Sequence, residues 1–111
     1  MTPFEARLEV EAGRPAVILA GELDAATLPL LLDVLELVIQ RSRQDVVIDL
    51  TRLEFIGSAG IGALARAARD LEARHRTLRL RAPVPHVQRV LDLTGLAGHV
   101  EPPVSNESNS S

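Results

Sequence analysis

The segment that most constrains the fold of this chain is a short continuous apolar run, DVVIDL, at residues 45–50. A β-strand that is covered on both faces has such a pattern, because neither face is left for polar side chains. Amphipathic helical patterns flank the run, one over residues 28–39 and one from Ser58 onward. Strands that alternate with helices indicate a sheet with right-handed crossover connections, so we expect a compact α/β domain.

The helix before this strand is the clearest periodic segment. Its apolar residues recur at spacings of three and four, which places them on one buried face. Asp24 or Thr27 is expected to cap its first turn, where Pro29 is tolerated because that position needs no N–H bond. The helix that begins at Ser58 has a similar inward stripe. The predicted buried positions are Leu28, Leu31, Leu32, Leu35, Val38 and Ile39 in the first helix and Ile61, Leu64, Ala65, Ala68 and Leu71 in the second.

The remaining elements are shorter and are separated by turn residues. An N-terminal β-hairpin is expected, with Gly13 in its turn, and residues 51–57 are interpreted as a connection between the buried strand and the second helix. An alternating strand and a third helix follow, and Gly95 is expected to end that helix. Residues 101–111, EPPVSNESNSS, are predicted to form a disordered polar tail after a single domain at residues 1–100. The hairpin strands are expected at residues 4–10 and 15–20, the later strand at 77–82 and the third helix at 86–93.

Composition excludes several classes of function. With 12 basic and 15 acidic residues among 111, the chain has a formal net charge of −3, which argues against general binding to nucleic acid. The chain has no cysteine, so it has neither a disulfide nor a thiol nucleophile. The N-terminus does not resemble a signal peptide, and Asp33 and Glu36 interrupt the longest apolar-rich run. We therefore expect a cytoplasmic protein that does not insert into membranes.

Residues 49–62, DLTRLEFIGSAGIG, contain the turn where enzyme motifs are tested first. A phosphate-binding P-loop requires a lysine, and the chain has none. A dinucleotide fingerprint requires the reverse of this glycine spacing, and a hydrolase nucleophile elbow requires glycine where Ile56 stands. The three histidines are scattered, so no metal site is predicted. Arginines 74, 76, 79 and 81 are expected on a solvated face. The sequence thus predicts no catalytic residue, no metal and no cofactor, and we do not expect an enzyme.

Ser58 has two compatible interpretations. As the first residue of a helix after a strand, its hydroxyl is suited to an N-cap. A phosphate on the same oxygen would meet the free N–H groups and the positive end of the helix, and it would add nearly two negative charges to one surface. An unmodified Ser58 can therefore cap the helix, and a modified one can act as a switch.

Several motifs in order resemble one known family. They are GELD at residues 21–24, VVIDL at 46–50, FIGSAGI at 55–61 and VQRVLDLTGL at 87–96. These segments are similar to the STAS domains of anti-sigma factor antagonists, and the resemblance extends over residues 8–100. It implies a single α/β domain with a mixed sheet of four to five strands and three to four helices.

The resemblance also implies a function. Members of the family bind an anti-sigma factor that is also a serine kinase, which releases the sigma factor. The kinase phosphorylates the position that Ser58 matches, and a phosphatase restores the active form. The expected state is a monomer or weak dimer. The partner-binding residues implied by the resemblance are Asp24, Thr51, Gly57, Ser58, Ala59, Gly60 and Ile61.

Two positions depart from the family pattern. The family usually has Asp immediately before the serine, and this chain has Gly57, which we interpret as a turn residue with positive φ. Ala59 stands where Ser or Thr is frequent. The alternative function is an accessory subunit of a lipid or anion transport system, which would bind the transporter ATPase and use Ser58 only structurally.

Overall fold

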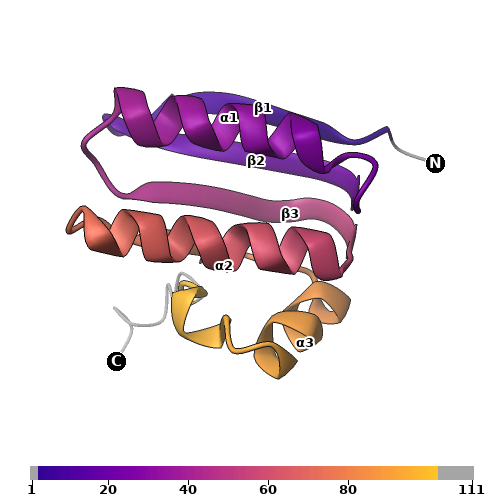
Figure 1. Ribbon diagram of the computed structural model, residues 1–111. Helices are drawn as coiled ribbons and strands as arrows, with labels where there is room; N and C mark the ends of the chain where they lie inside the picture. The colour runs from indigo at the N-terminus through magenta and orange to yellow at the C-terminus, as the bar shows by residue number, and fades with distance from the viewer. Residues whose placement is uncertain (1–2, 103–111) are drawn as a thin grey trace, which may run out of the picture.

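The computed structural model describes residues 3–102, which form a four-stranded mixed sheet with helices on both faces (Figure 1). The strands lie in the order β1-β2-β3-β4; β1 and β2 pair antiparallel, and β2–β3 and β3–β4 pair parallel. This confirms the predicted α/β class and the mixed sheet. The elements are β1 (Glu5–Glu11), β2 (Arg14–Leu23), α1 (Leu28–Arg41), β3 (Val46–Ile56), α2 (Ser58–Ala73), β4 (Leu78–Arg81), α3 (Pro85–Leu93) and the 3-10 helix η1 (Ala97–His99).

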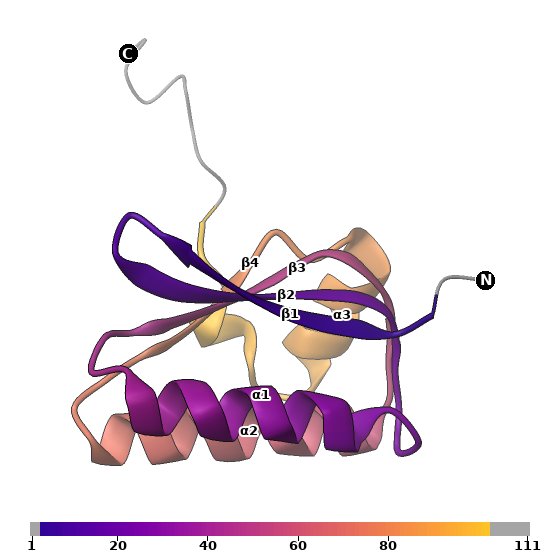
Figure 2. The same ribbon diagram turned by 90° about the horizontal axis from the view of Figure 1, so that it is seen from above.

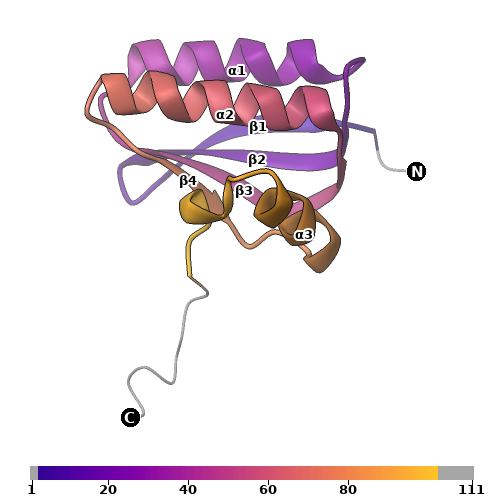
Figure 3. The same cartoon turned by 60° about the horizontal axis from the view of Figure 1, so that its bottom comes forward.

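The helices form two unequal layers. Helices α1 and α2 lie side by side on one face of the sheet (Figure 2). Both connect neighbouring parallel strands, and successive right-handed crossovers in one direction place their helices on the same face. Helix α3 and η1 lie on the opposite face, where they contact β3 and β4 (Figure 3). On this second face of the described sheet, no helix covers β1 and β2.

The core between these layers is aliphatic, as the composition predicts. The buried positions of α1 and α2 follow the predicted stripes, with Ala63 and Ala67 added on α2. Among the predicted positions, Leu28, Ile61 and Ala65 are only partly buried, and Leu32 is 45% exposed at the border between the two helices. The largest fully buried side chains are Leu19, Leu23, Leu31, Ile48, Leu50, Leu53, Leu64, Leu71, Leu78, Leu80, Leu91 and Val17.

Strand β3 is much longer than predicted. The expectation that residues 51–57 form a connection is wrong for all but Gly57, because the strand continues to Ile56. Opposite β2, two register shifts each place one extra residue in β3. A bulge of this kind turns the following side chains over, so Leu50, Leu53 and Ile56 are buried at a spacing of three instead of two. Because of this spacing, a search for alternating apolar and polar residues does not detect the second half of β3.

Helices α2 and α3 are each followed closely by a residue with a left-handed backbone conformation. Gly95, with φ of 84°, lies two residues after Leu93, the last residue of α3, and the N–H of Leu96 donates to the carbonyl of Leu91. This confirms Gly95 as the terminator. His75 has the same role after α2 with φ of 61°, although histidine adopts this conformation less readily than glycine.

Arg76 is a structural residue, which corrects the expectation of a solvated basic face. Its side chain is buried, where Nη1 donates to the Ile39 carbonyl at 2.7 Å and Nε donates to the Gln44 carbonyl at 2.7 Å. Burial lowers the pKa of the Arg76 guanidinium, and nearby Arg74 acts in the same direction. Arg76 thereby satisfies the Ile39 carbonyl, in the last turn of α1, and the Gln44 carbonyl in the loop that follows the helix.

The two arginines of β4 form ion pairs across the sheet. Arg81 donates from both terminal nitrogens to a Glu11 carboxylate oxygen at 2.8 Å, and this hydrogen bond raises its pKa. Arg79 lies 3.5 Å from Asp45. The Arg81–Glu11 pair connects the two edge strands on the face opposite α1 and α2, whereas the Arg79–Asp45 pair joins β4 to the residue before β3.

The chain end continues beside β4. The N–H of Glu101 donates to the Leu80 carbonyl at 2.8 Å, and Val100 forms an isolated bridge with Leu80. The part of the predicted tail that follows Pro102 lies outside the described residues. Within residues 3–102, no helix is both long and apolar enough to cross a membrane.

Candidate functional site

Ser58 is the first residue of α2, at the end where β2 and β3 finish. The preceding residue, Gly57, is the N-cap, and its carbonyl accepts the first helical hydrogen bond from Ile61 at 3.0 Å. The prediction that Ser58 is itself the N-cap is therefore wrong by one position. Ser58 is exposed, and α2 begins without a side-chain cap. The hydroxyl is thus available at the surface instead of being used to close the helix.

The backbone of Gly57 is extended, with φ of −94° and ψ of 179°. The prediction of positive φ is wrong, because an N-cap residue ordinarily has β-region angles. A Cβ at this position would lie 3.5 Å from Phe55 Cε2 and 3.8 Å from the Leu23 carbonyl oxygen, which are ordinary contacts. The fold therefore does not require glycine here, and an aspartate would fit.

Asp24 organises the loop between β2 and α1. Its Oδ1 accepts from the N–H groups of Ala26 and Thr27, both at 3.0 Å, and its own N–H donates to Thr27 Oγ1 at 3.0 Å. The Thr27 hydroxyl donates to the Glu22 carbonyl at 2.9 Å. Thr27 is the N-cap of α1, yet no side chain caps the helix, so the predicted capping by Asp24 or Thr27 is replaced by a closed turn before it.

Two interactions bring this loop and the start of α2 together. The Gly57 N–H donates to the Leu23 carbonyl at 2.9 Å. Gly60 then packs against the end of β2 so closely that a Cβ would meet Leu23 Cδ2 at 2.7 Å and Ile56 Cγ1 at 3.0 Å. Gly60 is buried, so it holds the two loops side by side without itself reaching the surface.

The other residues implied by the resemblance are distributed differently. Ala59 and Ile61 are half-buried next to Ser58, and Ile61 packs on the core. Thr51 is exposed in the middle of β3, where its N–H donates to Asp49 Oδ1 at 2.9 Å. Ile56 lies five positions further along β3, which is roughly 16 Å of extended strand. The structure therefore does not bring Thr51 together with Ser58.

Phe55 and His86 form a part of this surface that residue patterns did not single out. Their rings stack with centroids 6.4 Å apart and planes inclined by 24°, and Phe55 remains 40% exposed. Aromatic side chains are enriched in protein interfaces, because they bury a large area at a small entropic cost. Phe55 is one of only two aromatic residues, and this rarity was the available signal. We call Asp24, Phe55, Gly57, Ser58 and His86 the Ser58 surface.

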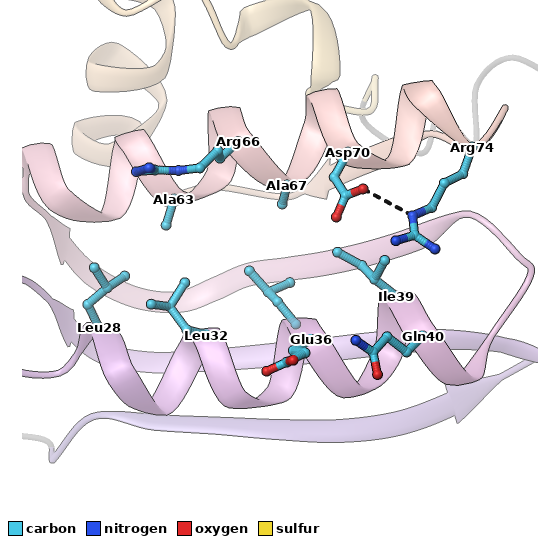
Figure 4. Close-up of a pocket in the computed structure, with 11 residues that line it drawn as sticks. Leu28, Leu32, Glu36, Ile39, Gln40, Ala63, Arg66, Ala67, Asp70 and Arg74 are labelled. Carbon is cyan, nitrogen blue, oxygen red and sulfur yellow. Dashed lines mark hydrogen bonds and ion pairs between the residues drawn. The ribbon is translucent and has the colours of Figure 1, made fainter.

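A separate groove runs between α1 and α2 (Figure 4). It has a volume of about 670 Å³, a size typical of small-ligand or peptide sites. Apolar side chains form its floor, and Asp70 and Arg74 form an ion pair of 3.0 Å at one edge. None of the residues of the Ser58 surface lines it. The groove is lined by Leu28, Leu32, Leu35, Glu36, Ile39, Gln40, Ala63, Arg66, Ala67, Asp70 and Arg74.

Comparison with known proteins identifies the family. The family model described as "Mlab, STAS domain" matches residues 6–102, which is most of the chain. The chain belongs to the STAS domain family. This STAS domain is 31% identical over 87 residues to the anti-sigma-B factor antagonist of Listeria monocytogenes, covering 77% of this chain and 75% of that protein. It is 30% identical over 80 residues to the anti-sigma-B factor antagonist of Staphylococcus epidermidis, covering 72% of this chain and 74% of that protein.

Solved structures agree with this assignment. An anti-sigma factor antagonist from Mycobacterium paratuberculosis superposes on this STAS domain with a TM-score of 0.83 at 28% identity, covering 97% of this chain and 93% of that one. The antagonist SpoIIAA in its unphosphorylated form superposes with a TM-score of 0.78 at 24% identity, covering 96% and 94% of the two chains. The second likeness supports the fold alone. Both the resemblance and the fold class predicted from the sequence are confirmed.

Proposed function

We propose that this STAS domain is an anti-sigma factor antagonist whose Ser58 surface binds a kinase-type anti-sigma factor in the cytoplasm. Binding releases a sigma factor, phosphorylation of Ser58 by the bound kinase ends the interaction, and a phosphatase reverses the modification. The observation that carries the proposal is an exposed Ser58 at the start of α2, between the Asp24 loop and Phe55. The similarity to anti-sigma-B factor antagonists supports the class of partner.

The position of Ser58 explains how a modification would act without unfolding the domain. The N–H groups of Ser58, Ala59 and Gly60 precede the first N–H bonded within α2, so they are free to face a phosphate. A phosphoserine adds about 1.5 to 2 negative charges at the start of α2, next to the loop that carries Asp24. The fold would tolerate this charge, whereas a partner that presents an acidic or apolar surface to Ser58 would be repelled.

Gly57 changes the surface that a kinase would recognise beside Ser58. It removes the carboxylate that usually precedes the modified serine in this family, although the backbone would accept one. The surface next to Ser58 is therefore more apolar, with Phe55 Cε2 close to the Gly57 position. We expect the cognate kinase to recognise Phe55 and Asp24 in place of the missing carboxylate.

Affinity capture tests this proposal. Wild-type protein, Ser58→Asp and Ser58→Ala are used as baits in native lysate of the source cells with Mg²⁺ and ADP, so that binding is not followed by phosphoryl transfer, and retained proteins are identified by mass spectrometry. A separate incubation of each bait with lysate, Mg²⁺ and ATP measures phosphorylation. We expect a kinase-like ATPase on wild type and Ser58→Ala but not on Ser58→Asp. We also expect one phosphoryl group on wild type after incubation and none on Ser58→Ala. Equal retention of that ATPase by all three baits would remove the switch from the proposal.

The groove between α1 and α2 favours a second candidate function. A partner seated there would cover Leu32 and Ala63 without touching Ser58. This arrangement suits an accessory subunit that binds a lipid or anion transporter ATPase. In that case the Ser58→Asp bait retains a membrane-transport ATPase as well as wild type does, and Leu32→Asp loses it.

A further inference from the structure

The outer edge of β1 is an unpaired strand edge within the described structure. Strand β1 pairs only with β2, so one row of its backbone N–H and C=O groups faces away from the sheet. The side chains of Ala6, Leu8 and Val10 point to the same face as α1, since their partners on β2 include Leu19 and Val17 of the core. Leu8 and Val10 are nevertheless exposed, and Val10 is 73% exposed.

Helix α1 extends this apolar surface beyond the strand. Leu37 lines a shallow hollow together with Leu8 and Val10, with a volume of about 360 Å³. Leu30 lies seven residues before Leu37, so it is on the same side of the helix, and both are exposed. We call Leu8, Val10, Leu30 and Leu37 the β1–α1 patch. Exposed strand edges normally carry charged residues or proline. The charged residues of β1 are confined to the side of the strand away from α1, so the side shared with α1 is apolar.

The opposite side of β1 carries charges that suit a second copy of the same strand. Arg7 Nε lies 3.0 Å from Glu9 Oε2. If two β1 strands pair antiparallel with Leu8 on the two-fold axis, Arg7 of each copy lies opposite Glu9 of the other. Opposite charges at directly facing positions stabilise a strand pair. With Arg7 on the axis instead, Arg7 would face Arg7 and Glu5 would face Glu9, which would be repulsive.

The register centred on Leu8 also accommodates the remaining residues. It places Leu8 against Leu8 and Ala6 against Val10 on the side of α1. Glu5 faces Glu11, and the repulsion between these carboxylates is reduced because Glu11 is bonded to Arg81 at 2.8 Å. Because facing residues point to the same side of a sheet, both α1 helices lie on one face and bring their exposed leucines toward the axis.

We propose that β1 and α1 form a two-fold interface with a second copy of this chain. The interface joins two four-stranded sheets into one continuous sheet and covers the β1–α1 patch of both copies. No residue of the Ser58 surface belongs to β1 or α1, so a dimer presents two Ser58 surfaces at once. The proposal does not depend on the identity of the partner at Ser58.

The mass of the protein in solution over a range of concentrations tests this interface. Sedimentation with interference optics is suitable because the chain has neither Trp nor Tyr. We expect the wild-type mass to rise with concentration toward twice the 12.0 kDa of one chain. Val10→Lys and Arg7→Glu should each weaken association at least ten-fold. The charge exchange Arg7→Glu with Glu9→Arg should restore it, because the facing charges are again opposite.

Leu93→Lys is the matched control, since Leu93 is 80% exposed on α3, away from β1. It should dimerise as wild type does. A wild-type protein that stays monomeric at every concentration overturns the proposal. So does a dimer that is insensitive to Val10→Lys, or one weakened equally by Leu93→Lys. Failure of the charge exchange to restore a dimer lost in Arg7→Glu overturns the register.

Discussion

Replacing Gly60 and measuring the stability of the domain tests how the two loops at the Ser58 surface are held together. Replacing it by alanine adds a methyl group that would lie 2.7 Å from Leu23 Cδ2 and 2.8 Å from Leu23 Cγ. Ile56 Cγ1 lies at 3.0 Å on another side of the same methyl. Both neighbours are buried, so neither side chain can swing out to solvent. The start of α2 must therefore move away from the end of β2, or Leu23 must leave its preferred rotamer.

Two effects of opposite sign set the magnitude. Overpacking a well-packed core costs about 1–3 kcal/mol. Alanine is about 1 kcal/mol more favourable than glycine inside a helix, and less so in the first turn. We therefore expect Gly60→Ala to destabilise the domain by about 1–2 kcal/mol. For a domain of this size, each kcal/mol lowers Tm by roughly 4–8 °C.

Gly62→Ala is the control, because a Cβ there would meet only Arg66 Nη2, at 3.8 Å. It gains the helix propensity without the clash and should raise stability by up to about 1 kcal/mol. Urea denaturation followed by far-UV circular dichroism measures both variants, since tryptophan fluorescence is not an option in this chain. If Gly60→Ala were as stable as Gly62→Ala, the close approach of α2 to Leu23 would not exist in solution.

Two further predictions concern the ends of the helices. Gly57→Asp should raise stability by about 0.3–1 kcal/mol, because a carboxylate at the N-cap accepts free N–H groups and favours the helix dipole. The helix end depresses the pKa of that carboxyl, so the gain should be present at neutral pH and lost as pH falls below about 4, and urea denaturation at both pH values checks this. Arg76→Met should cost about 2–4 kcal/mol in the same assay, because the Ile39 and Gln44 carbonyls lose their donors. Arg76→Lys should retain only part of the stability that Arg76→Met loses. A loss below about 1 kcal/mol for Arg76→Met would contradict a capping role.

The sequence was sufficient for the order of the elements and for most of the core. Helical periodicity identifies the inner faces of α1 and α2, since burial recurs there with the period of the helix. Strand β3 was recognised only as far as Leu50, because two bulges turn the side chains over and replace alternation by a spacing of three. A bulge depends on the pairing with a neighbouring strand, and that pairing leaves no local mark in the sequence.

The site was predictable in its location but less so in its details. Motif order located Ser58 at the start of a helix, whereas the N-cap position and the extended φ of Gly57 depend on where Leu23 accepts a hydrogen bond. Arg76 looked like one more solvated arginine, because its carbonyl partners are more than thirty positions away in the chain. Thr51 was grouped with Ser58 through the family resemblance, and the length of β3 separates the two residues.

The agreement between strand order in the sheet and strand order in the chain has a consequence for synthesis on the ribosome. Each strand after β1 is added at the growing edge, next to the strand made just before it. No strand has to insert between two that are already paired, and each crossover helix is complete before the next strand emerges. The domain can therefore assemble vectorially from its N-terminal hairpin, because domains begin to fold from the end that is made first. During that process the newest strand presents the edge at which the next strand pairs, and β4 is the last strand added to the described sheet.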